Sequence, residues 1–202
     1  MRGWVDRAQR IVVLTGAGLV VRTHDVVIRY LRVRPGLGPV RPEDNDGVSI
    51  LGGDLASGAD THHVVLDHLS VSWSEDELFS ALAVRDVTVS RSLLSEALDD
   101  ARHPKGAHSA GLLIGFGTTC ATVHRSVLAH DGFRNPLLTD VGRVDYVNNL
   151  AYDHGPLAGE VRPDVLPGEI NLVDNAWIAG PSSDPAAPQV HVYGDHPVHA
   201  VI

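Results

Sequence analysis

A charged side chain stands close to a proline in the segment AHDGFRNPLL, residues 129–138, where Arg134 lies two positions before Pro136. A solvated arginine beside a turn is the simplest interpretation of such a pair. Two carboxylates elsewhere in the chain favour a functional role for Arg134 instead, because Asp46 and Asp76 each precede a short apolar run, as Arg134 does. Carboxylates that converge from separate segments suit a hard cation such as calcium, which takes several oxygen ligands. These residues are therefore the first candidates for chemistry.

More titratable side chains accompany these candidates along the chain. They are Glu43, Asp44, Glu75 and Glu77, and in a later charged segment Glu96, Asp99, Asp100, His103, Lys105 and His108. A solvated acidic rim accounts for the carboxylates as well as a metal does. No loop with a fixed metal-binding spacing decides between the two, so both interpretations stay open.

Composition limits the partners of the chain. Its 202 residues are enough for one domain with a buried core, and the formal net charge of -9 argues against binding to nucleic acid. An acidic polysaccharide is still possible, because a few local cations and a bound metal can hold its carboxylates. The single cysteine, Cys120, excludes an internal disulfide, and no apolar run is long enough for a signal peptide or a membrane span. The oligomeric state is left open.

Short runs of alternating apolar residues recur along the chain and predict β-strands. Aligned on the first apolar residue, the runs begin at Val26, Val64, Val87, Ala121, Val144, Ile170 and Val190, separated by 38, 23, 34, 23, 26 and 20 residues. A period in the twenties is typical of a solenoid, in which each coil buries its inner face by stacking on the next. Helical spacing over three turns is absent between Val20 and Ile202. The sequence therefore predicts an all-β, single-stranded right-handed parallel β-helix.

Two further features place the corners and the loops of this solenoid. Polar pairs such as Asn148–Asn149 follow the first strand of most repeats, and a structural ladder at one corner is predicted for them, because Asn and Asp tolerate left-handed bends. A second strand per coil is predicted to start near Asp46, Asp76, Ala110 and Asn135, on one edge. Residues 1–202 are expected to form a single domain with loop insertions near 35–61 and 95–118. Function commonly lies on loops that a rigid scaffold holds, so the site is expected at this edge.

Five segments, in this order, resemble the pectate lyase superfamily, in particular polysaccharide lyase family one: VVIRYLRVRPG, DHLSVSWSEDE, HPKGAHSAGLLIG, AHDGFRNPLL and VDYVNNLAY. The resemblance covers the chain from about Gly16 to Tyr152. It implies a parallel β-helix that cleaves an acidic polysaccharide, pectate or polygalacturonate, by calcium-assisted β-elimination. It also implies a secreted or periplasmic protein, and a chain that lacks the N-terminal coils and cap of the family domain.

The resemblance also implies roles for individual residues. Arg134 matches the arginine that removes the C5 proton of a galacturonate unit, while Asp46 and Asp76 match calcium ligands. Lys105 lies near the place of a substrate-binding lysine, and we predict that Lys105 and His108 bind substrate.

Two positions depart from the family pattern. Thr139 stands where a second arginine is expected, and Ser80 stands where a third acidic ligand is expected. Weaker calcium binding, or recruitment of Glu77 or a substrate carboxylate, would follow from the second change. Both changes favour an alternative function, a non-catalytic carbohydrate-binding or adhesive β-helix. A glycoside hydrolase would need paired carboxylates that no motif picks out here.

Histidines offer a second choice of base. A guanidinium is normally always protonated, whereas an imidazole changes its charge near neutral pH. The candidates are His68, His103, His108, His124 and His130. They rank below Arg134, because His68 and His124 fall in the predicted corner ladders.

Overall fold

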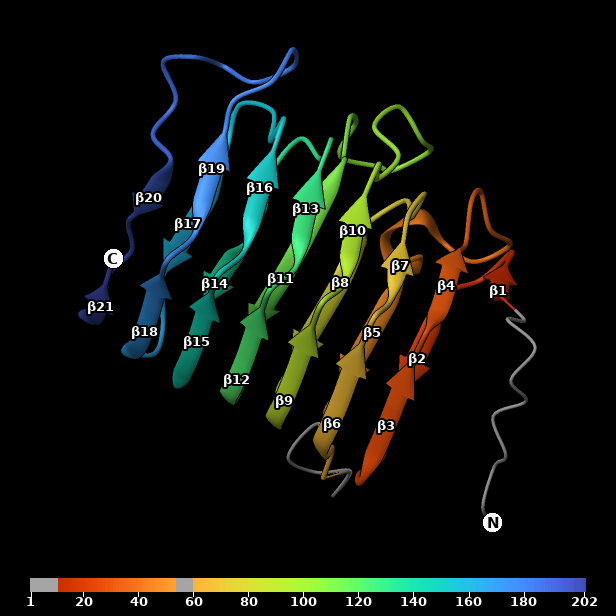
Figure 1. The fold of residues 1–202 in the computed structure, drawn as a ribbon, viewed down its shortest axis with the longest axis horizontal. Coiled ribbons are helices and arrows are strands. Elements are labelled where there is room, and N and C mark those ends of the chain that lie inside the picture. The colour runs from red at the N-terminus through yellow and green to blue at the C-terminus, as the bar shows by residue number, and fades with distance from the viewer. Residues whose placement is uncertain (1–10, 54–59) are drawn as a thin grey trace.

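The structure, a computed structural model, describes residues 11–53 and 60–202 and is a right-handed parallel β-helix (Figure 1). Each coil contributes one strand to each of three parallel sheets, so the predicted fold class is confirmed. Sheet A contains β1 (Val12–Thr15), β4 (Leu31–Arg34), β7 (Ser70–Val71), β10 (Leu93–Ser95), β13 (Val127–Ala129), β16 (Leu150–Tyr152) and β19 (Ala176–Ile178). Sheet B contains β2 (Leu19–Val21), β5 (Val48–Leu51), β8 (Glu77–Leu82), β11 (Ala110–Gly115), β14 (Leu137–Thr139), β17 (Gly159–Arg162) and β20 (Val190–Val192). Sheet C contains β3 (Val26–Arg29), β6 (His62–Asp67), β9 (Arg85–Ser90), β12 (Thr119–His124), β15 (Arg143–Val147), β18 (Gly168–Val173) and β21 (Val198–Val201).

The core is a set of apolar ladders that run along the axis of the solenoid. In sheet B, strand register places five fully buried side chains in one row, namely Ile50, Ala81, Ile114, Leu138 and Val161. Alternation along each strand turns these residues inward, and parallel pairing satisfies the backbone between coils. Like residues therefore stack on like residues, as the repeating apolar runs predict.

The corner between sheets C and A carries the polar pairs. One residue per coil takes a left-handed backbone there, among them His68, Arg91 and Asn148. The following residue points an acceptor at the preceding coil: the amide of Ser126 donates to Asn149 Oδ1 at 2.9 Å, and the amide of Asn149 donates to Asn175 Oδ1 at 2.9 Å. The structural role predicted for Asn148 and Asn149 is confirmed.

The last predicted repeat needs a correction. The run at Val190 was aligned with the runs of sheet C, but β20 pairs with β17 and lies in sheet B. Sheet C continues instead with β21, which pairs with β18. The reason is that residues 179–189 form a long connection between β19 of sheet A and β20 of sheet B. This connection delays the strand of sheet B until 20 residues after Ile170, where a strand of sheet C was expected.

Helical structure within residues 11–53 and 60–202 is limited to one 3-10 turn, η1 (Pro42–Asp44). Among these residues, no helix has the length and apolar character needed to cross a membrane.

Most of the extra chain projects from one corner, between sheets A and B. These connections run through residues 35–47, 96–109 and 179–189, and the largest of them rise above the strands at the top of Figure 1. The two insertions predicted from the sequence each contain a strand of sheet B, β5 and β11. The strands that follow this corner are the predicted second strands, which do stack in one sheet.

Asp131, in the connection between β13 and β14 at the same corner, gives a testable pH dependence. Its side chain is buried; Oδ1 accepts a hydrogen bond from the amide of Ala97, and Oδ2 has no partner in the described part of the chain. Burial, helped by the charge of Glu96, raises the pKa of Asp131 to about 8. Its carboxyl is thus protonated in the folded state at a pH where the unfolded chain ionises it, so this group's contribution to stability falls as pH rises from about 4 to 8.

We expect Asp131→Asn to raise the free energy of unfolding by about 1–3 kcal/mol at pH 8, because Asn keeps the amide acceptor without the buried charge. At pH 3.5 the gain should vanish. Denaturant unfolding at both pH values, with exposed Asp174→Asn as control, measures this. A variant that is no more stable than the parent at pH 8 would contradict it.

Candidate functional site

The predicted site residues gather at the corner between sheets A and B. Asp46 lies between η1 and β5, Asp76 directly precedes β8, and Arg134 precedes β14. Because β5, β8, β11 and β14 are successive neighbours in sheet B, these three residues belong to three of four consecutive coils. The insertion that leads into β11 adds His103 and His108. The corner thus brings together side chains that are far apart in sequence.

A buried carboxylate, Glu75, holds the connections of this corner against one another. Both its oxygens accept hydrogen bonds from Arg102, at 2.9 and 2.7 Å, and it also accepts from the amide of Gly38 and from Asn45 Nδ2. Arg102 in turn donates to the carbonyl of Gly38 at 2.9 Å. The side chain of Glu75 is fully buried, so this charge is compensated by a cation and neutral donors. Glu75 therefore positions the neighbouring Asp76 and is not itself free for a ligand.

The backbone around Arg134 is set by a close approach to the preceding coil. Arg134 has a φ of 60°, in the left-handed region, and its carbonyl accepts the amide of Leu112 at 2.7 Å. A Cβ on Gly111 would lie 2.7 Å from that same carbonyl, so only glycine permits this approach. Gly111 is thus needed for the backbone that presents Arg134.

The guanidinium of Arg134 turns toward the carboxylates. Its Nη1 donates to Glu77 Oε1 and lies 3.9 Å from Asp76 Oδ1, and the group sits 4.9 Å from the ring centre of Phe133. The side chain is only 18% exposed. Burial lowers the pKa of Arg134, whereas the charges of Asp76 and Glu160 act in the opposite direction. This arginine is therefore a partly buried cation that faces acidic groups, and not a solvated side chain beside a turn.

Asp46 is held by two hydroxyl groups of sheet B. Its Oδ2 accepts from Ser49 Oγ at 2.8 Å and from Ser80 Oγ. Burial and, more weakly, the nearby charge of Asp76 raise the pKa of Asp46, the two serines and Arg134 lower it, and the net value is about 6. Ser80 thus stands in the site where a third acid is expected, but it donates to a carboxylate instead of adding one.

Three carboxylates, those of Asp46, Asp76 and Glu77, bring ligand atoms within 4.8 Å of one another. Oxygen atoms from separate coils at this spacing suit calcium. Two observations fit a cation at this place: Asp76 Oδ1 is buried without a hydrogen-bond partner among the described residues, and the charge of Asp76 makes Asp46 harder to ionise. The residues that would hold calcium are therefore Asp46, Asp76 and Glu77.

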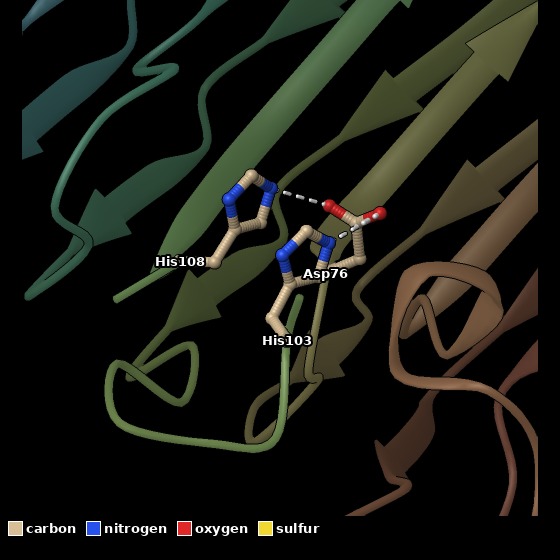
Figure 2. Close-up of side chains that lie close together, drawn as sticks. All are labelled: Asp76, His103 and His108. Carbon is tan, nitrogen blue, oxygen red and sulfur yellow. Dashed lines mark ion pairs between the residues drawn. The ribbon is translucent and has the colours of Figure 1, made fainter. Parts of the chain in front are cut away.

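Asp76 also faces two histidines of the insertion (Figure 2). Nε2 of His108 lies 2.8 Å from Asp76 Oδ1, and Nε2 of His103 lies 3.8 Å from Asp76 Oδ2. The two imidazole rings are stacked, with centres 3.7 Å apart and planes within 6°. Burial lowers the pKa of His103, and the neighbouring His108 lowers it further.

Most of the predicted site residues come together, with one exception. Lys105 lies in the exposed part of the insertion, where its amide donates to His103 Nδ1 at 3.2 Å. Thr139 lies in β14, and its buried hydroxyl has no hydrogen-bond partner in the described part of the chain. Its partner in register on the next coil is Arg162, which is a cation near Arg134 that the sequence did not point to.

Two contacts of the site were not predicted from the sequence, although their members were noted. The spacing of HPKGAH does signal a histidine pair, but not that both rings face Asp76. The contact of Glu77 with Arg134 joins residues 57 positions apart and has no sequence signal.

The fold and the site define a class of protein: a right-handed parallel β-helix with an acidic cluster at the corner between two sheets, where the carboxylates face the guanidinium of Arg134. The chain is similar over much of its length to fungal proteins named probable pectate lyase C. It is 28% identical over 165 residues to the one from Aspergillus terreus, 29% over 166 residues to the one from Neosartorya fischeri, and 29% over 159 residues to the one from Aspergillus oryzae. These matches cover 81%, 81% and 77% of this chain. The resemblance predicted from the motifs is confirmed.

The chain spans about a third of the length of these relatives, since the matches cover 35%, 34% and 33% of them. No protein family model matches the chain.

Proposed function

We propose that this chain carries the site of a polysaccharide lyase that cleaves an acidic polysaccharide, with pectate as the leading substrate. The observation that carries the proposal is the convergence of the half-buried Arg134 on the three carboxylates of Asp46, Asp76 and Glu77. The similarity to proteins named pectate lyase supports it. A site outside the cytoplasm, where such polymers occur, is part of the proposal.

The reaction is a β-elimination. A base removes the C5 proton of a uronate unit, the electron pair forms a C4–C5 double bond, and the C4–O bond to the next sugar breaks with protonation of the leaving oxygen. When bound, calcium would make that C5 proton more acidic by neutralising the adjacent carboxylate. Asp46, Asp76 and Glu77 would hold the ion, and it would let a chain of net charge -9 bind an acidic polymer.

Arg134 is the proposed base. Burial lowers its pKa, which is the direction that proton removal requires. Its contact with Glu77 stabilises the charged form of the guanidinium. The guanidinium therefore becomes available to substrate only when Glu77 breaks this contact and pairs with another group. Lys105 and His108 remain the proposed substrate-binding residues, with His108 the nearer of the two to Asp76.

A second function, a carbohydrate-binding module without catalysis, is supported by the changed position Thr139. Its hydroxyl offers no charge to a substrate carboxylate, and it is buried. Binding of oligogalacturonate without any unsaturated product would favour this function over the lyase.

Absorbance of unsaturated products tests the lyase directly. On polygalacturonate we expect activity that a chelator removes and added calcium restores. Asp76→Asn should lower it by at least about tenfold at limiting calcium, because one ligand charge is lost. Asp99→Asn, at an exposed residue of the insertion that carries His103 and His108, is the control. Calcium-independent turnover, or an Asp76→Asn variant equal to the parent, would contradict the calcium site.

A further inference from the structure

The contact of Asp76 with the histidine pair leaves three ligand atoms without hydrogen-bond partners. Nε2 of His103, Nε2 of His108 and Oδ1 of Asp76 are all buried and unpartnered within residues 11–53 and 60–202. The 2.8 Å contact of His108 with Asp76 therefore lacks the alignment of a hydrogen bond. Buried polar atoms in native proteins nearly always have a partner, so three that face one another indicate a missing ligand.

The burial of these groups separates them from an ordinary surface cluster. The side chain of His103 is 0% exposed and that of His108 is 6% exposed. Both rings point their Nε2 atoms at the one carboxylate, as Figure 2 shows. By contrast, the exposed His24 and His63 and the partly buried His62, at the corner between sheets B and C, neighbour carboxylates without forming such a set among the described residues.

We propose that Asp76, His103 and His108 bind one divalent transition-metal ion, represented by zinc, through one carboxylate oxygen and the two Nε2 atoms. Two imidazoles and a carboxylate are the ligand set that zinc, cobalt and nickel accept, whereas calcium takes oxygen ligands. Asp76 therefore lies between two cation sites of different chemistry, with oxygen ligands from Asp46 and Glu77 on one side and nitrogen ligands on the other. This inference does not depend on the proposed lyase function.

Binding requires a small rearrangement of the rings. Because the rings are parallel, their in-plane lone pairs run side by side and do not meet at one point. Ligation turns at least one ring out of the stack. The amide of Lys105 also gives up its 3.2 Å contact with His103 Nδ1, since that nitrogen carries the proton when Nε2 binds a metal. Lys105 is exposed, so water can replace the lost acceptor.

Cobalt and zinc titrations of the whole chain, first stripped with a chelator, test the proposal. We expect one Co²⁺ per chain with visible absorption bands, and displacement of that ion by Zn²⁺. His103→Phe and His108→Phe each keep a flat ring in the stack but lose the ligand, so each should weaken Zn²⁺ binding by at least about tenfold in calorimetry. Zinc affinity that is unchanged in the double variant would overturn the proposal.

Two matched variants locate the ion. His130→Phe removes a histidine that is paired with a carboxylate, Asp153, at 2.9 Å. Among the described residues this pair is not part of a three-ligand set, so the exchange should leave Zn²⁺ affinity unchanged. Asp46→Asn removes a carboxylate from the cluster of Asp46, Asp76 and Glu77 but leaves both histidines in place. It should therefore weaken Zn²⁺ binding less than either histidine variant. A larger effect of Asp46→Asn would place zinc among the carboxylates and overturn the proposal.

A measurement on the parent chain avoids any folding defect of the variants. Nitrogen NMR of the imidazoles should show that Zn²⁺ shifts the Nε2 resonances of His103 and His108, together with the amide of Lys105. Shifts confined to His24, His62 and His63 would show binding at the surface and contradict the proposed site.

Discussion

Arg134→Lys is expected to lower turnover on polygalacturonate with added calcium by on the order of 10³-fold, the range that a positioned base contributes. Lysine keeps the positive charge but loses the planar group and its reach toward Asp76 and Glu77. Folding and substrate affinity should change little, because lysine retains the positive charge that faces the carboxylates. Initial rates and KM measured together separate a loss in the catalytic step from a loss in binding.

Arg91→Lys is the matched control for this variant. Arg91 is also a non-glycine residue with a left-handed backbone and a carboxylate partner, Asp67, but it lies at the corner between sheets C and A. Its exchange should leave the rate within about twofold, because Arg91 lies at another corner and lysine keeps a positive charge beside Asp67. Full activity of Arg134→Lys would remove Arg134 from the role of base and direct attention to His108.

Leu138→Ala is expected to destabilise the fold by about 2–5 kcal/mol. Leu138 is fully buried and stacks between Ile114 and Val161, so truncation opens a cavity inside the solenoid that neighbouring coils cannot close. For a domain of this length the unfolding midpoint should fall by roughly 5–15 °C. Thermal and denaturant unfolding, followed by circular dichroism, measure the loss.

The control for this variant is Leu93→Ala in β10. Leu93 is 41% exposed, and its exchange should cost less than about 1 kcal/mol. Equal losses for the two leucines would contradict the assignment of Leu138 to the core ladder.

The sequence predicted the repeating part of this molecule better than its irregular part. Alternating apolar runs such as that at Val64 identify strands, because a half-buried strand has a period of two. The run at Val190 shows the limit of this reasoning, since gaps of 20 to 38 residues leave the sheet of a given strand undetermined when a connection is long. The sheet to which such a strand belongs is set by its pairing with the strands of neighbouring coils, and only the folded chain displays that pairing.

The same limit applies to the candidate site. Asp46, Asp76 and Arg134 could be grouped because each precedes a strand of one sheet, and strand starts stack. The roles of Glu75 and Glu77 could not be separated, since both flank Asp76 in sequence; one is enclosed by Arg102, and the other faces Arg134. Side-chain direction at a corner depends on local backbone, such as the left-handed conformation of Arg134, which no pattern of residue types specifies.

The corner ladder of Asn149 gives the solenoid a polarity. Its backbone amides donate in one direction, each to a side chain of the following coil: Ser92 to Ser126, Ser126 to Asn149, and Asn149 to Asn175. These three corner amides are therefore satisfied by the successor of their coil. Removing one acceptor, as in Asn149→Ala, leaves the buried amide of Ser126 unsatisfied, at a cost of about 1–3 kcal/mol. A defect in this ladder therefore destabilises the coil on its N-terminal side first, so the two ends of the stack differ in how local unfolding begins.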